Sequence, residues 1–166
     1  MRLALSAAAL ALVAACATPV TIEAPFSPEE VAYVSTRGAA TVEGQAFLRQ
    51  MGGGVVTCAG EEVSLIPAGT YATELFTKMF GSPQGGRMSA LSLVDPGETP
   101  ARFRELQRRA QCDAEGDFAF AGVADGPYYV MTRVVWTVGD SFIPEGGFLA
   151  RRIEVSGGRD TRVLLN

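Results

Sequence analysis

Residues 112–138 constrain the fold of this chain more than any other stretch, because they have the pattern of two strands connected by tight turns. A turn rich in Asp and Gly at 113–117 opens the stretch, and Phe118 and Phe120 then alternate with alanines. A second turn at 124–127 reverses the chain into a long run of β-branched and aromatic residues. Aromatic residues at period two, bounded by Gly, Asp and Pro, are typical of strand–turn–strand units. The sequence therefore predicts that the domain is built around paired β-strands.

Other short apolar segments along the chain also predict strands. They lie at 41–49, 55–58, 63–67, about 107–112, 128–138, 148–155 and 160–165. Segments 55–58 and 63–67 fit either one bent strand or a tight hairpin. In 128–138 the more apolar face, which includes Trp136 and Val138, is expected to point inward. Residues 82–100 show little periodicity and predict a long irregular loop.

Residues 71–80 change to a helical period. Tyr71, Leu75 and Met79 recur every four residues, and Gly81 stands where a C-cap glycine is expected. We interpret this helix as a lid over one open end of the core. Together with the strands, it predicts an all-β protein, a sandwich of seven or so strands of the transthyretin or immunoglobulin type with one short inserted helix.

Residues 113–129 also carry a recognisable motif, Asp-x-x-Gly-x-Phe-x-Phe-x-x-Val followed by Gly-x-Tyr-Tyr. It resembles the carboxypeptidase regulatory-like domain, a transthyretin-like β-sandwich, and the similarity extends over about 38–166. The resemblance implies a turn at Asp113 and Gly116, inward-facing Phe118 and Phe120, and a non-catalytic role as scaffold, spacer or binding module. It also fits Gly44, segment 63–67, and Gly126 and Tyr128 at the start of the next strand.

The N-terminus has the pattern of an export signal. Arg2 precedes an uncharged Leu- and Ala-rich run over 3–15 that is too short to span a bilayer comfortably. The run ends in small residues directly before Cys16 and resembles the lipobox of bacterial lipoproteins. The resemblance implies cleavage before Cys16, lipidation of that residue and, because Ala17 follows, sorting to the outer membrane. Ordinary secretion with cleavage near the same alanines is the alternative.

These patterns divide the chain into three parts. Residues 1–15 are expected to be a signal peptide, 16–37 a lipidated cysteine with a Pro-rich tether, and 38–166 the β-sandwich domain. Within the tether, 31–36 fits a short strand. The lipid would hold the protein in the cell envelope as an outer-membrane lipoprotein, with the domain on the periplasmic face.

Cys58 and Cys112 are the two cysteines that remain after Cys16. An even pair in an exported domain most simply forms one disulfide. A metal site is not expected, because two thiols without any histidine give too few soft ligands. Alternate carboxylates in the 113–117 turn favour calcium only weakly, and an Asx-type turn explains them better.

Catalysis is not expected, chiefly because the chain has no histidine. That excludes Ser–His and Cys–His nucleophile pairs. Lys78, the single lysine, would need burial beside a serine to form a Ser–Lys dyad. Paired carboxylates can hydrolyse glycosides, but those available here lie in turn-like contexts: Asp95, Glu98, Asp113, Glu115, Asp117, Asp125, Asp140 and Glu145. No cofactor is expected either.

The charge of the chain restricts its partners. A formal net charge of −4 at pH 7 is not that of a nucleic-acid-binding protein. The arginines between 102 and 162 fit either solvated strand faces or a surface for a polyanion. The expected partners are the membrane, through the lipid, and an envelope protein or glycan.

The loop at 139–147 is the best candidate contact site, because it carries Phe142 and Ile143 at its tip. These side chains would either project outward or fold back over the end of the core, against Phe76 or Phe80. We expect a non-catalytic binding or structural module that acts through strand-end loops. An accessory subunit that docks through an edge strand or the 82–100 loop is the alternative, and a hydrolase of polysaccharide or cell wall is less favoured.

Overall fold

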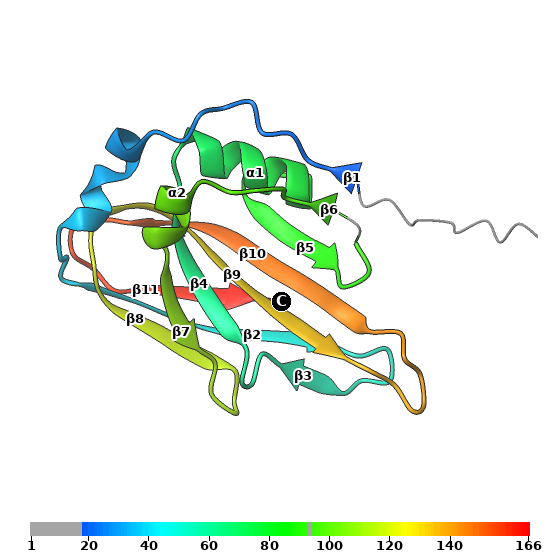
Figure 1. Ribbon diagram of the computed structural model, residues 1–166. Helices are drawn as coiled ribbons and strands as arrows, with labels where there is room; N and C mark the ends of the chain where they lie inside the picture. The colour runs from blue at the N-terminus through cyan, green and yellow to red at the C-terminus, as the bar shows by residue number, and fades with distance from the viewer. Residues whose placement is uncertain (1–17, 93) are drawn as a thin grey trace, which may run out of the picture.

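The computed structural model describes residues 18–92 and 94–166, so that the predicted signal peptide and Cys16 lie outside the described residues (Figure 1). β-Strand accounts for 44% of the described chain and helix for 16%. The elements in chain order are β1 (Thr18–Pro19), η1 (Pro28–Ser35), β2 (Ala40–Arg49), β3 (Val55–Thr57), β4 (Glu62–Pro67), α1 (Thr70–Phe80), β5 (Gly85–Ser89), β6 (Val94–Asp95), α2 (Ala101–Glu105), β7 (Arg108–Gln111), β8 (Asp117–Val123), β9 (Gly126–Trp136), β10 (Glu145–Val155) and β11 (Thr161–Leu165).

Apart from the short two-stranded β1–β6 sheet, the strands form two packed sheets, which confirms the predicted all-β sandwich. The five-stranded sheet has the order β5-β10-β9-β4-β7, and all of its pairs are antiparallel. In the other sheet β2 is central, with β11 parallel on one side and β8 and β3 antiparallel on the other. Helix α1 matches the predicted helix, and η1 and α2 are two further short helices.

The space between the sheets is filled by the alternate residues that the period-two pattern assigned to the inner face. Phe118 and Phe120 of β8 are buried there, as are Val130 and Val134 of β9. Trp136 is only half-buried, although it packs against this core. The prediction for Val138 is wrong: β9 ends at Trp136, and Val138 is exposed because it already lies in the loop.

Cys58 and Cys112 form the predicted disulfide, with a Cα–Cα distance of 5.7 Å. Both residues are buried in the core between the sheets. Cys58 follows β3 of the four-stranded sheet, and Cys112 follows β7 of the five-stranded sheet, so that the bond links the two layers. Segments 55–58 and 63–67 are therefore neither one bent strand nor a hairpin, because β3 and β4 belong to different sheets.

Helix α1 does not close an open end of the sandwich, as the sequence suggested, but covers the outer face of the five-stranded sheet as a third layer (Figure 1). Phe76 of α1 stacks on Tyr129 of β9 with ring centroids 3.9 Å apart. Phe103 of α2 joins the same cluster. The helix takes this position because β9 exposes large apolar side chains on both of its faces, and the outer ones need a cover.

Residues 82–100 are not one irregular loop. Gly85–Ser89 forms the edge strand β5, which pairs with β10, and Val94–Asp95 forms the short strand β6. After them comes helix α2, and strand β7 then begins at Arg108, close to the predicted start at about 107. The pairing partner β10 lies some sixty residues away, so that local periodicity does not reveal β5.

The segment that we expected to be a tether is packed on the domain from the first described residue. Its predicted strand at 31–36 is wrong, because Pro28–Ser35 forms the 3-10 helix η1, with Val31 buried. Tyr33 donates a hydrogen bond to the carbonyl of Pro127, and its ring lies where a Cβ atom at residue 126 would be. Gly126, with a φ of 148°, leaves room for that ring.

Candidate functional site

The β9–β10 loop projects its apolar tip into solvent. Phe142 is 99% exposed and Ile143 is 62% exposed. The loop is supported by the two longest strands, which pair continuously from Glu145↔Trp136 to Val155↔Gly126. Of the two arrangements that the sequence left open, the structure therefore shows the outward one, and neither side chain folds back toward Phe76 or Phe80.

Short-range hydrogen bonds fix the shape of this loop. The amide of Ser141 donates to the carbonyl of Val138 at 3.1 Å, and the Ser141 hydroxyl accepts from the amide of Ile143 at 3.1 Å. At the base, the indole Nε1 of Trp136 donates to a carboxylate oxygen of Glu145 at 3.0 Å. The tip is therefore presented by an ordered turn on a rigid hairpin, which reduces the entropy lost on binding.

Other exposed apolar residues lie at the same end of the sandwich. Strand β5 ends next to the start of β10, where the amide of Ala90 donates to the carbonyl of Gly146 at 3.1 Å, and Leu91 follows in an exposed position. The β2–β3 turn, with Met51 at its tip, lies at this end too (Figure 1). We call this surface the loop end: Met51, Leu91, Val138, Phe142 and Ile143. Grouped exposed apolar residues of this kind mark contact surfaces.

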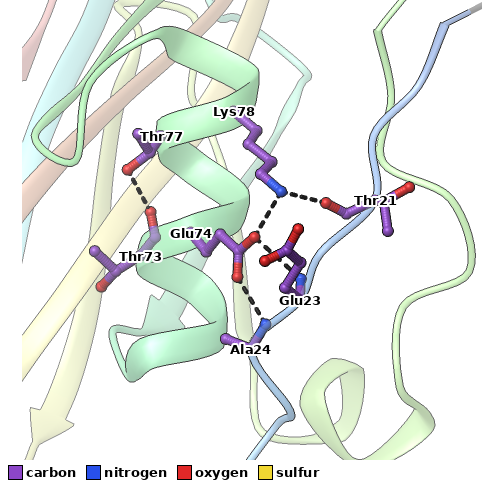
Figure 2. A network of polar contacts seen from close by, with 7 residues as sticks. All are labelled: Thr21, Glu23, Ala24, Thr73, Glu74, Thr77 and Lys78. Carbon is purple, nitrogen blue, oxygen red and sulfur yellow. Dashed lines mark hydrogen bonds and ion pairs between the residues drawn. The ribbon is translucent and has the colours of Figure 1, made fainter.

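A second constellation joins the N-terminal segment to α1 (Figure 2). The Glu74 carboxylate accepts from the amide of Glu23 at 3.0 Å and from the amide of Ala24 at 2.7 Å. It also pairs with Lys78 one turn later, at 2.6 Å, and Lys78 donates to the carbonyl of Thr21. We call these contacts the Glu74–Lys78 clamp. Because Lys78 is engaged with a carboxylate and a carbonyl on the protein surface, the structure gives no support to a Ser–Lys dyad.

The clamp has an electrostatic signature. The hydrogen bond from Lys78, followed by those from the amides of Glu23 and Ala24, lowers the pKa of Glu74 from 4.5 to about 2. Glu74 therefore stays ionised at pH values at which ordinary surface carboxylates are half protonated. The sequence held one signal for this pair, the i, i+4 spacing of Glu and Lys on a helix, but nothing in it indicated which distant amides the carboxylate would bind.

We expect Glu74→Ala to release the N-terminal segment. The amides of Glu23 and Ala24 should exchange with solvent at least several-fold faster, as measured by hydrogen-exchange NMR, while the amides of β9 keep their protection. Because folding depresses the pKa of Glu74, its contribution is fully present above pH 4.5 and is lost as the pH falls through about 2. If the amides of Glu23 and Ala24 exchanged as fast in the wild type as in the variant at pH 4, that result would contradict the clamp.

A hollow of about 730 Å³ lies beside α1, and its polar groups are already paired with one another. Glu30 accepts from the amide and the hydroxyl of Thr70, and Arg152 donates to the hydroxyl of Thr73. Arg152 also lies over the ring of Tyr129. These contacts connect η1, α1 and β10, and we interpret them as structural.

The Asp113 turn is of the Asx type. Its carboxylate accepts from the amides of Glu115 at 3.0 Å and Asp117 at 2.8 Å. Within residues 18–92 and 94–166, no three acidic or cysteine side chains gather as metal ligands would. The Asp113 carboxylate therefore serves the turn, and the weak calcium signal gains no support.

The arginines are spread over several elements. Arg102 pairs with Glu105, and Arg109 pairs with Glu62 across the β4–β7 ladder. Arg108 donates to the carbonyl of Ala121. Such exposed pairs contribute little stability, and their arrangement agrees with solvated strand faces.

Comparisons with known proteins give a solved structure that is similar over most of the chain. No family model matches the chain, and no curated protein matches it significantly. The chain is similar to a solved structure from Pseudomonas aeruginosa, a candidate carbohydrate-binding protein, with a TM-score of 0.68 and 27% identity over 84% of this chain and 96% of that one. A minor pilin of Streptococcus agalactiae matches with a TM-score of only 0.36 and 12% identity, over 78% of this chain and 44% of that one.

The Cys58–Cys112 disulfide and the similarity to a candidate carbohydrate-binding protein both fit an extracellular or envelope protein. In the part of the chain that the structure describes, no helix has the length and apolar character needed to cross a bilayer. A carbohydrate-binding neighbour is also consistent with a binding module.

Proposed function

We propose that this protein is a non-catalytic binding module of the bacterial cell envelope that makes contact through its loop end. The observation that carries the proposal is the full exposure of Phe142, next to the largely exposed Ile143, on a rigid hairpin. Leaving such side chains in water is costly unless a partner covers them. Support for a non-catalytic role comes from the missing histidine and from carboxylates that serve turns.

The ligand class that we propose is a glycan. Support comes from the neighbour at 27% identity, a candidate carbohydrate-binding protein, and from the chemistry of the loop. The Phe142 ring presents an apolar face to the C–H groups of a sugar ring, while Ser141 and Asp140 offer hydroxyl and carboxylate partners for sugar hydroxyls. A few polar groups beside an apolar platform are the usual composition of such sites.

The anchor is part of the same proposal. Lipidation of Cys16 would hold the domain on the outer membrane, on the periplasmic face, after removal of residues 1–15. The carboxypeptidase regulatory-like resemblance adds the expectation of a scaffold or binding role. The buried disulfide supports an oxidising compartment.

An accessory subunit of an envelope assembly remains the second candidate. The observation that favours it is the edge strand β5, which pairs only with β10 among the described strands and therefore leaves one backbone edge for a partner strand. Docking of this kind would use backbone hydrogen bonds and would not depend on the loop tip.

We expect a Phe142→Ser, Ile143→Ser variant of the mature protein to bind envelope polysaccharide at least about tenfold more weakly. The reason is that the contact would lose two apolar side chains that the bound glycan covers. Binding is measured by isothermal titration calorimetry against purified envelope glycans. Leu164→Ser, which changes an exposed apolar residue on β11, is the matched control and should bind normally.

Two outcomes would count against the glycan proposal. Unchanged affinity in the double variant would place the ligand away from the loop end. Capture of one envelope protein by crosslinking, equally from the wild type and the double variant, would favour docking through the β5 edge.

A further inference from the structure

We propose that the loop end faces the membrane that carries the protein, so that Phe142 and Ile143 dock on the lipid surface. The inference rests on the lipid anchor at Cys16 in the proposed function. It deepens that function, because the lipid surface and a glycan then compete for the same tip, so that the loop end takes a glycan only when it leaves the membrane. Three observations on different parts of the molecule support it.

The first observation is that the N-terminal segment is fixed on the domain. It runs antiparallel along α1, where the Glu74–Lys78 clamp holds residues 21–24 (Figure 2). Farther on, Phe26 packs edge-on against the rings of Tyr71 and Phe103. A segment that makes these contacts cannot act as a free spacer, and it determines where the chain leaves the domain.

The second observation is the place where the described chain begins. Thr18 pairs with Val94 in the β1–β6 ladder, and the amide of Val20 donates to the carbonyl of Asp95 at 2.9 Å. Strand β6 follows shortly after β5, whose last residue, Ser89, pairs with Gly147 at the base of the β9–β10 loop. Figure 1 shows β1 toward the same end of the molecule as this loop.

Cys16 stands two positions before Thr18 in the sequence, and two extended residues span roughly 7 Å at most. A lipid on Cys16 would bring the membrane surface to this end of the sandwich and not to the opposite end, where η1 and the β8–β9 turn lie (Figure 1).

The third observation is the chemistry of the surface that would meet the membrane. The loop end carries exposed Leu91, Val138, Phe142 and Ile143, and the half-buried Trp136 lies at the base of the same hairpin. Aromatic and aliphatic tips of this kind enter the boundary between headgroups and acyl chains. Since the anchor already holds the domain at the membrane, even a weak apolar contact is populated, because it is intramolecular.

The same end of the hairpin carries two carboxylates, Asp140 in the loop and Glu145 at its base. These would lie at the level of the lipid headgroups and would be repelled by an anionic surface. The contact should therefore be strongest on zwitterionic lipid. For this reason the test uses vesicles of phosphatidylcholine.

Trp136 provides a native probe, because it is the only tryptophan in the chain. The full chain is expressed with its signal, purified in lipidated form and reconstituted in phosphatidylcholine vesicles, with and without lipids brominated near the headgroup. We expect bromine to quench the Trp136 fluorescence of the wild type. Phe142→Ser, Ile143→Ser should lose more than half of the quenching, and Leu164→Ser should keep it.

A Glu74→Ala, Lys78→Ala variant tests the effect of the clamp independently of the loop. Its loop end is intact, but release of the N-terminal segment should also reduce quenching by more than half while the protein still floats with the vesicles. Near- and far-UV circular dichroism of each variant, matching that of the wild type, establishes that the sandwich is folded.

The inference would be overturned if the wild-type protein floated with the vesicles but its Trp136 fluorescence were not quenched. It would also be overturned if the Phe142→Ser, Ile143→Ser variant were quenched as strongly as the wild type. Normal glycan binding by the mature, unlipidated chain would then leave the proposed function standing. Absence of lipid on the purified protein would overturn the anchor and, with it, the membrane-facing orientation.

Discussion

Replacing Phe76 with alanine is expected to lower the free energy of unfolding by about 3–5 kcal/mol. Phe76 is 1% exposed and stacks on Tyr129, which is itself fully buried in the outer face of the five-stranded sheet. Removing the ring would leave a cavity between α1 and β9 that the helix backbone cannot fill. The change is measured by urea unfolding followed by circular dichroism.

Phe80, one turn farther along α1, is the matched control. It stacks on Phe76 at 5.6 Å but is only half-buried near the end of the helix. Phe80→Ala should therefore cost clearly less than Phe76→Ala. Equal losses for the two variants would mean that α1 is not held on the sheet by the Phe76–Tyr129 stack.

Loss of the Cys58–Cys112 disulfide is expected to destabilise the domain by about 4 kcal/mol. The bond closes a loop with a sequence separation of 54, and the chain-entropy model assigns about that much to a loop of this length. The bond also ties the two sheets together in the core, where both cysteines are buried. A Cys58→Ala, Cys112→Ala variant should show the loss in urea unfolding.

Reduction of the wild type with dithiothreitol provides an independent comparison. It should lower the stability to nearly that of the double variant and should have no effect on the double variant itself. A reduced wild type that unfolds at the same urea concentration as the oxidised protein would contradict the proposed contribution of the disulfide.

The strands with a clear alternation of apolar and polar residues were the predictable part of the fold. Period-two patterns placed β8, β9 and β10 correctly, because each has one face in the core. They did not reveal that β8 pairs with the distant strand β2 and not with β9. Helix α1 was found from its four-residue spacing and its C-cap at Gly81, which has a left-handed φ of 74°. The disulfide followed from cysteine count and compartment alone.

The errors share a physical cause. Strand β5 begins with two glycines, and only the ladder with β10 makes it a strand. Residues 31–36 contain β-branched and aromatic residues, but η1 forms there because Val31 and Tyr33 find apolar and hydrogen-bonding partners on the domain. In both places, tertiary contacts override local preference.

The candidate site was predictable only in part. Phe142 and Ile143 were found from sequence, because apolar residues in a polar loop are conspicuous, yet outward and inward arrangements fitted the sequence equally well. The Glu74–Lys78 clamp was not found, since its acceptors and donors lie fifty or more residues apart in the chain.

The sequence by itself determined the β-sandwich, the residues that form α1, the disulfide pair and the residues at the tip of the contact loop, because each of these is encoded by local periodicity, turn chemistry or residue count. Only the tertiary structure decided that α1 forms a third layer, that residues 18–36 are packed on the domain and that the loop tip faces outward. Those features depend on which distant surfaces bury one another, and burial between distant segments leaves no periodic signal in the chain.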